Sequence, residues 1–186
     1  MLAATYSRSG SFPRALSRRA GFTYAEIMVG LTILSLVAGS VLWGLNQLSY
    51  YAGAARLYTA AQTLAQNQID LLLTLGPYDP AQGLLPRPSG CATKSILDAG
   101  ATYYWDLTAA ANTCPISATP KTVPIYKDPM NNNQIVSGTI ATTVATTPFA
   151  VNGVGLDVRQ ATVKVAYRYG RRDYEVVMET MRTSDK

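Results

Sequence analysis

The fold of this chain is decided by residues 18–45, which read RRAGFTYAEIMVGLTILSLVAGSVLWGL. One acidic residue, Glu26, stands at the start of an uncharged run that continues to Ala55. The most apolar part of the run, Ile27 to Leu45, has about the length at which a helix crosses a hydrocarbon core of ~30 Å. A charge at membrane depth costs roughly 3 kcal/mol, and less near the interface. The stretch therefore predicts a membrane-spanning helix in which Glu26 is either functional or a mere interfacial charge.

The net positive charge lies ahead of this run. The 186 residues carry a formal charge of +5, but from Phe22 onward 12 Lys and Arg stand against 11 Asp and Glu. This near-neutral remainder gives no electrostatic argument for a nucleic-acid-binding domain. The positive-inside rule places residues 1–21 in the cytoplasm and the bulk of the chain outside it. The basic residues that precede Glu26 are Arg8, Arg14, Arg18 and Arg19.

Two simpler interpretations of the N-terminus compete with a functional one. A cleaved secretory signal has a shorter apolar core followed by a small-residue cleavage site. The core here is too long, and no convincing A-x-A site follows it. A plain membrane anchor fits the hydropathy equally well, but it gives no reason for Glu26.

The segment GFTYAEIMVGLTILSLVAGSVL, Gly21 to Leu42, resembles the N-terminal signature of type IV pilin-like proteins. These are the type IV pilins, the minor pilins and the pseudopilins of type II secretion, in which a basic leader, a Gly, a Phe, a hydroxyl residue and a Glu precede an unbroken apolar segment. The resemblance implies that a prepilin peptidase cuts between Gly21 and Phe22. It also implies methylation of the new amine of Phe22.

Glu26 has an expected role in assembly. Cleavage after Gly21 would leave a cationic amine on Phe22, and a spacing of four residues would put this amine and Glu26 on one helix face. An unpaired carboxylate is costly among apolar helices, so pairing between the two groups is favoured. Pairing within one chain stays open, whereas the resemblance implies pairing with the Phe22 amine of a neighbouring subunit.

The helix is predicted to continue beyond the membrane. Residues 50–75 contain no Pro and are dense in Ala, Leu and Gln, and Gly76 and Pro77 supply a stop. The expected helix therefore runs from about Phe22 to Leu75. Its second half carries a stripe at helical spacing on which a globular domain would pack, formed by Leu57, Ala61, Leu64, Gln68, Leu71 and Leu75.

The two cysteines lie in a segment rich in Pro, Gly, Ala and Thr, from Tyr78 to Thr119. One strand is expected there, at Ala101 to Leu107, among connecting loops. An extracytoplasmic location and an even count favour a disulfide between Cys91 and Cys114, worth roughly 3 kcal/mol. Two unpaired buried thiols are the alternative.

The C-terminal third has the pattern of strands. A half-exposed strand is expected at TIATTVATTPF, residues 139–149, and a hairpin over residues 160–182 with its turn at Gly170 to Asp173. Cross-strand ion pairs are expected between Lys164 or Arg168 and Glu175 or Glu179. The predicted fold class is α+β and pilin-like, with a long, partly transmembrane N-terminal helix packed on a small C-terminal antiparallel β-sheet.

Nothing in the sequence favours an enzyme, a cofactor or a metal site. The chain contains no His, which removes Ser-His-Asp and Cys-His catalysis. NGVGLD, residues 152–157, is too short for a phosphate-binding glycine motif and is interpreted as a turn. KDPMNNN, residues 127–133, offers oxygen ligands for calcium, but its spacing matches no known calcium loop and a polar loop is preferred.

The sequence therefore predicts a structural subunit, a minor pilin or a pseudopilin-like protein. Its expected parts are a cleaved cytoplasmic leader (1–21), a transmembrane and assembly half-helix (22–48), an amphipathic periplasmic half-helix (49–76) and a periplasmic globular domain (77–186). Its expected partners are a prepilin peptidase, the bacterial inner membrane, and other pilin or pseudopilin subunits in a pilus or pseudopilus. The alternative is a single-pass membrane-anchored periplasmic binding module.

Overall fold

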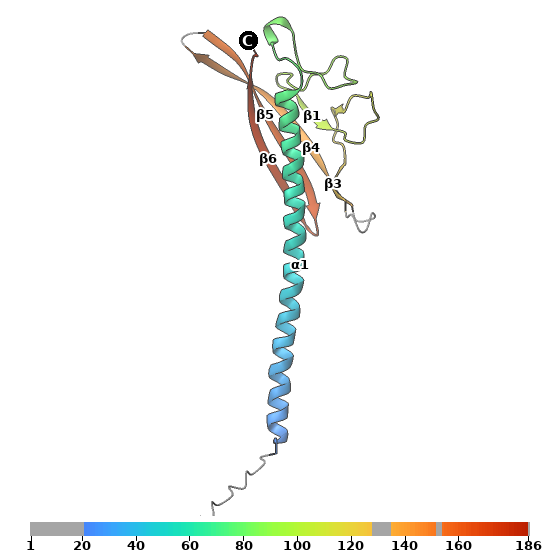
Figure 1. The fold of residues 1–186 in the computed structure, drawn as a ribbon, viewed down its shortest axis with the longest axis vertical. Coiled ribbons are helices and arrows are strands. Elements are labelled where there is room, and N and C mark those ends of the chain that lie inside the picture. Colours follow the sequence, from blue (N-terminus) through green and yellow to red (C-terminus); the bar gives the residue numbers. More distant parts are fainter. Residues whose placement is uncertain (1–20, 128–134, 152–153, 186) are drawn as a thin grey trace, which may run out of the picture. The chain divides into compact units, whose positions relative to one another are not determined.

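The computed structural model of the chain describes residues 21–127, 135–151 and 154–185 (Figure 1). A single long helix comes first and is followed by a short 3-10 helix and six strands. These elements are α1 (Tyr24–Thr74), η1 (Pro80–Gln82), β1 (Thr102–Trp105), β2 (Ile116–Ser117), β3 (Val123–Lys127), β4 (Ile135–Val151), β5 (Val154–Tyr169) and β6 (Arg172–Thr183).

The bounds of α1 confirm the expected helix to within two residues at each end. Gly76 has φ +61°, a left-handed conformation that glycine adopts without strain, and Pro77 follows it. Helical hydrogen bonding reaches Leu75, whose N–H donates to the Leu71 carbonyl at 2.9 Å. The Gly-Pro pair therefore ends the helix where the sequence places the stop.

The chain divides into two compact units, residues 1–47 and 48–186. In the first unit the described part is the N-terminal half of α1, and α1 is long and apolar enough to cross a membrane. The three Ser and Thr side chains of this half bond to carbonyls one turn earlier, as expected for a helix in an apolar environment. These bonds run from Thr32 to Val29, from Ser35 to Leu31 and from Ser40 to Val37.

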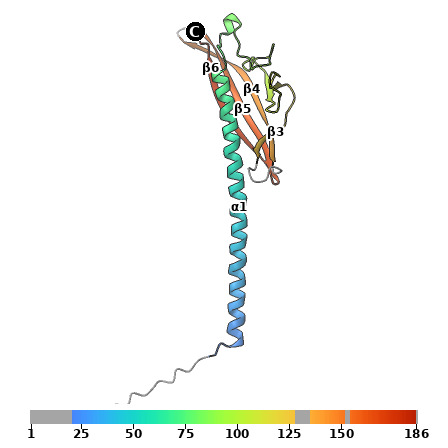
Figure 2. The same ribbon diagram turned by 45° about the vertical axis from the view of Figure 1, so that its right-hand side comes forward.

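The second unit contains an antiparallel sheet with the strand order β2-β1-β4-β5-β6. Figure 2 shows β4, β5 and β6 beside one another. The strand β3 also pairs with β4, at residues 135–138, while β1 pairs with residues 141–143 of the same strand. The strands predicted at residues 101–107 and 139–149 are confirmed as β1 and β4, and the predicted hairpin is confirmed as β5 and β6. The sheet is nevertheless larger than expected, because β4 and β5 run for 17 and 16 residues.

The strands β4 and β5 are longer than expected because a segment predicted to be a turn is part of β5. The segment 152–157 was expected to be a turn, but Val154 to Asp157 belong to β5 and pair with β4. Asn152 and Gly153 lie outside the described residues. The second turn is also tighter than predicted, since β5 ends at Tyr169 and β6 begins at Arg172. Gly170 has φ +62°, as such a two-residue turn requires.

The helix stripe packs on the sheet, but not through all the residues that the spacing selects. Leu57, Ala61 and Gln68 are buried as expected, whereas Leu71 is 37% exposed and Leu64 and Leu75 are only partly buried. Ala65 and Leu72 complete the buried face instead. They lie in one hydrophobic core with side chains from the inner face of the sheet, including Tyr103, Trp105, Ile140, Val144, Val163, Val165, Tyr167 and Val176.

The outer face of the sheet carries the predicted ion pairs in part. Lys164 pairs with Glu175, but Arg168 pairs with Asp173 at 3.7 Å. Glu179 lies opposite Thr162 in the register and accepts a hydrogen bond from the Gln160 amide at 3.1 Å. The expected pairing of Glu179 with a basic residue is therefore wrong, because the register places polar neutral side chains beside it.

Candidate functional site

The predicted cleavage site lies just ahead of α1. Gly21 and Phe22 are not helical, and the Phe22 side chain is 77% exposed. Among the described residues, and apart from Gly21 and its chain neighbours, no atom lies within 4 Å of the position that a Cβ on Gly21 would occupy. The backbone at this bond is therefore open to close approach by another molecule. Residues 1–20 of the expected leader lie outside the described residues.

Glu26 occupies the first turn of α1, where the helix dipole favours a negative charge. Its backbone N–H donates to the Thr23 hydroxyl at 3.3 Å, and the Thr23 carbonyl accepts from Ile27 at 3.2 Å. Thr23 is thus the N-cap. The spacing T-x-x-E is the sequence signature of a capping box, and it was available in the sequence but not used.

The cap changes the expected geometry of Phe22 and Glu26. Because α1 begins at Tyr24, Phe22 precedes the first helical residue by two positions in the uncleaved chain. In the uncleaved chain the two residues therefore do not share a helix face, whereas the expectation from their spacing concerns the chain after cleavage. Thr23 takes the non-helical cap position, which displaces Phe22 from the helix.

The apolar half of α1 presents its side chains to the surroundings. None of its most apolar window is buried within the chain. Single exposed hydrophobic residues are normal on protein surfaces, but a continuous apolar surface of this size marks a contact with lipid or with another protein. Its large exposed side chains between Glu26 and Trp43 are Ile27, Met28, Val29, Leu31, Ile33, Leu34, Leu36, Val37, Val41, Leu42 and Trp43.

The other end of α1 is held by Arg182 of β6. This side chain is 7% exposed, and it donates to the Leu72 carbonyl at 2.9 Å and to the Gly76 carbonyl at 2.7 Å. It also pairs with the Asp185 carboxylate at 2.9 Å. The guanidinium thus satisfies carbonyls that a helix leaves unpaired at its C-terminus, and its charge is favourable there.

Tyr78 and its neighbours extend this anchor. The Tyr78 ring is fully buried, with the Arg182 guanidinium carbon 5.6 Å from its centroid. Burial raises the pKa of the Tyr78 hydroxyl, and Arg159, which donates to it at 2.9 Å, opposes that rise. The Tyr78 N–H and then Arg182 lower the pKa of Asp185. These contacts join the end of α1 to β5, β6 and the C-terminal residues.

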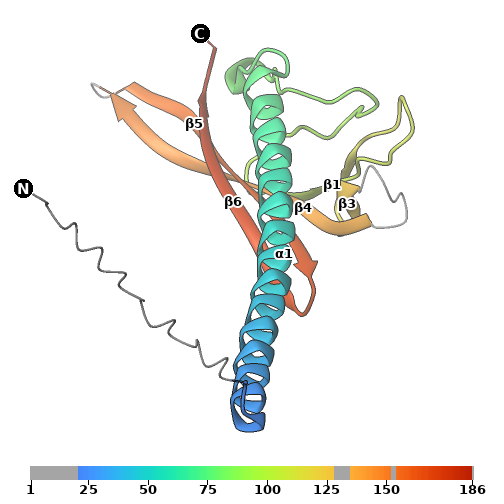
Figure 3. The same cartoon turned by 60° about the horizontal axis from the view of Figure 1, so that its bottom comes forward.

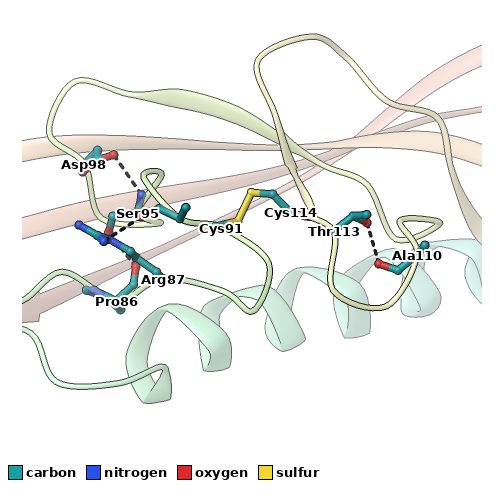
Figure 4. The surroundings of a disulfide bond; sticks show 9 residues. Pro86, Arg87, Cys91, Ser95, Asp98, Ala110, Thr113 and Cys114 are labelled. Carbon is teal, nitrogen blue, oxygen red and sulfur yellow. Dashed lines mark hydrogen bonds between the residues drawn. A yellow bond between two sulfur atoms is a disulfide. The ribbon is translucent and has the colours of Figure 1, made fainter.

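The two cysteines form the disulfide expected from their number and location, Cys91–Cys114 (Figure 4). The loops on either side are ordered by short hydrogen bonds, among them Ser95 Oγ to the Pro86 carbonyl at 2.8 Å. Gly90 has φ +81°, and a Cβ there would lie 2.6 Å from the Asn112 carbonyl oxygen. Only a glycine allows the two loops to approach so closely beside the bridge.

A cluster of four tyrosines joins the β5–β6 hairpin to α1. Tyr50 stacks on Tyr169 with 5.3 Å between ring centroids, and Tyr167 stacks on Tyr174 at 5.5 Å. The hydroxyls of Tyr50 and Tyr174 are 3.5 Å apart. Gly53 makes room for this contact, since a Cβ there would overlap the Tyr169 hydroxyl. We call these four residues the tyrosine cluster.

The outer face of the sheet has an open hollow of about 510 Å³. Its charged side chains are Lys164, Arg168, Asp173 and Glu175, which form the two ion pairs described above. The charges of the hollow are thus mutually compensated. Of the candidate calcium loop, residues 128–133 lie outside the described residues.

Comparisons of the chain with protein-family models, with curated proteins and with solved structures found no match.

Proposed function

We propose that the chain is a structural subunit of the type IV pilin-like class, a minor pilin or a pseudopilin, which assembles through the N-terminal half of α1. The observation that carries the proposal is the uncovered apolar half-helix with Glu26 in its first turn, immediately after the Gly21–Phe22 bond. A plain anchor accounts for the apolar surface, and helix capping alone would account for Glu26, so the cleavage and pull-down experiments below separate the two functions.

The proposed location is the bacterial inner membrane, with residues 1–21 in the cytoplasm and the globular domain in the periplasm. The distribution of basic residues supports this orientation. The Cys91–Cys114 disulfide supports an oxidising compartment for the domain. A prepilin peptidase would remove residues 1–21 and methylate Phe22, and the exposed backbone at Gly21 suits such access.

Assembly would then pair charges between subunits. After removal of residues 1–21 the new amine of Phe22 would stand directly ahead of the Thr23 cap at the start of the helix, close to the level of Glu26 of an adjacent subunit. Within a bundle of apolar helices, the register that pairs these charges is favoured over registers that leave them apart. Glu26 would thereby fix the axial position of one subunit against the next.

The test co-expresses the full chain with a prepilin peptidase and with related subunits of its host. Intact mass should show a chain that begins at Phe22 with one added methyl group. Glu26→Ala should be cleaved as the parent is, yet be recovered less with other subunits in pull-downs from membranes. Glu26→Asp, whose carboxylate reaches less far, should be intermediate. Thr23→Val is the matched control, because it removes the cap hydroxyl that Glu26 contacts and keeps the carboxylate.

Two results would refute the proposal. A full-length chain in peptidase-positive membranes would favour the membrane-anchored binding module. Equal recovery of Glu26→Ala and the parent would leave Glu26 as an interfacial charge only.

A further inference from the structure

We propose that the tip of the β5–β6 hairpin, residues 168–173, is a membrane contact that binds anionic lipid headgroups beside the spanning helix. This inference rests on the proposed function only in that α1 must cross a bilayer. It concerns the second unit of the chain, whose contact with lipid has no part in the assembly through Glu26.

The hairpin tip has an excess of positive charge. It contains Arg168, Arg171 and Arg172 against a single carboxylate, Asp173. Arg168 pairs with Asp173 at 3.7 Å, and both side chains are more than two-thirds exposed. No carboxylate lies within ion-pair distance of Arg171 or Arg172 in the described part of the chain. The tip therefore presents two exposed, uncompensated cations.

The tip is fixed to one turn of α1 by the tyrosine cluster. Figure 3 shows this end of the β5–β6 hairpin beside α1. The Tyr50 ring stacks on Tyr169, and the position that a Cβ on Gly170 would take is 3.5 Å from that ring. Gly53, one turn later on the helix, leaves the space that Tyr169 occupies. Wherever Tyr50 lies with respect to a membrane, the arginines of the hairpin lie close to the same level.

Tyr50 belongs to the segment that follows the apolar run. It comes five residues after Leu45, and five residues of helix rise by about 7 Å. The headgroup layer on each side of a bilayer is about 5–8 Å thick, the difference between a core of ~30 Å and a total of ~40–45 Å. Trp43, Tyr50 and Tyr51 are also residue types enriched at this interface. The chain therefore tethers the hairpin tip, through Tyr50, within a few residues of the apolar run.

Lipid phosphate is the occupant that these observations favour. A basic side chain near an anionic membrane surface strengthens binding by about fivefold, so Arg171 and Arg172 together give about 25-fold. An acidic surface on another protein has the same charge complementarity, but nothing ties it to the turn of α1 that follows the apolar run. The contact would hold the globular domain against the bilayer.

The experiment uses the full chain in nanodiscs of neutral phosphatidylcholine, or of phosphatidylcholine with one third phosphatidylglycerol. Hydrogen exchange measured by mass spectrometry reports on the tip through residues 168–174, and on the span through residues 27–45. Exchange of the tip should be at least fivefold slower in the anionic discs at low salt, and the difference should vanish at high salt, where charges are screened. Arg171→Glu with Arg172→Glu should exchange equally in both discs.

The matched control is Arg87→Glu with Lys94→Glu, which makes the same change of charge at exposed positions outside the tip and should behave as the parent does. Equal exchange of the parent tip in both discs would overturn the proposal, even if the double variant fails to fold. So would slowing by inorganic phosphate in neutral discs, or slowing only after membrane proteins are added. Fast exchange over residues 27–45 would refute the membrane span itself. Slow exchange there, together with equal exchange of the tip in both discs, would refute the lipid contact and leave the proposed assembly intact.

Discussion

Replacement of Arg182 by methionine should remove the anchor at the end of α1 and keep much of the apolar stem. The side chain makes three hydrogen bonds of 2.7–2.9 Å, to the Leu72 carbonyl in the last turn of α1, to the Gly76 carbonyl just beyond the helix and to Asp185. Hydrogen bonds to a charged group contribute about 1.5–3 kcal/mol each, and breaking a buried ion pair costs about 3–5 kcal/mol. Gly76 and Asp185 are exposed, so water recovers part of this loss for their oxygens.

The expected loss for Arg182→Met is therefore at the lower end of these ranges, about 3 kcal/mol. Arg182→Lys keeps the charge but not the planar fork, so about half of that loss is expected. Arg172→Met is the control, since Arg172 is exposed on the hairpin tip and its replacement should change stability by less than about 0.5 kcal/mol.

The assay is urea unfolding of the full chain in detergent micelles, followed by tryptophan fluorescence. Trp43→Phe in every variant leaves Trp105, which is 3% exposed in the core, as the reporter. The free energy of unfolding is compared at constant slope, so that changes in the unfolded state are recognised. A loss below about 1 kcal/mol for Arg182→Met would show that the helix end is satisfied without this side chain.

Two further predictions use the same assay. The pKa of Asp185 is lowered in the folded chain, so its contribution to stability is complete above the ordinary Asp pKa of about 4 and is lost as the pH falls through the lower folded value. Asp185→Asn should therefore make the free energy of unfolding fall less steeply below about pH 4. If the variant and the parent lose stability equally in this pH range, Asp185 does not make the contribution described. Replacing both cysteines of the Cys91–Cys114 bridge by alanine should lower the free energy of unfolding by about 3 kcal/mol, as expected for a bridge that closes a loop of this length. Reductant should then have no further effect on the double variant, whereas a stability equal to that of the parent would mean that the bridge does not restrict the unfolded chain.

Local patterns in the sequence were sufficient for the elements that they define. The uncharged run and the Gly76–Pro77 stop fixed the length of α1, and period-two alternation located the hairpin from Val163 to Met178. Other choices depended on the sheet. Within the run Leu71 to Leu73 hydrophobicity alone cannot tell which residue is buried, and the sheet covers Leu72.

Features that join distant segments had no sequence signal. Arg182 meets the carbonyl of Leu72 across 110 positions, and no periodicity connects them. The strand β3 did leave a weak signal that was missed, because Val123 and Ile125 alternate with exposed or half-exposed neighbours. Pro124 argues against a central strand, and within the described residues β3 pairs with β4 alone.

The late position of β6 in the chain also sets the order of events during synthesis. A ribosome adds about 5–20 residues per second, so about 6–20 s separate Leu72 from Arg182 on the growing chain. Throughout that interval the stripe that begins at Leu57 has no complete sheet to cover it, because β5 and β6 are still being made. The nascent chain is therefore prone to aggregation throughout this interval, and chaperone protection would matter until β6 has been made.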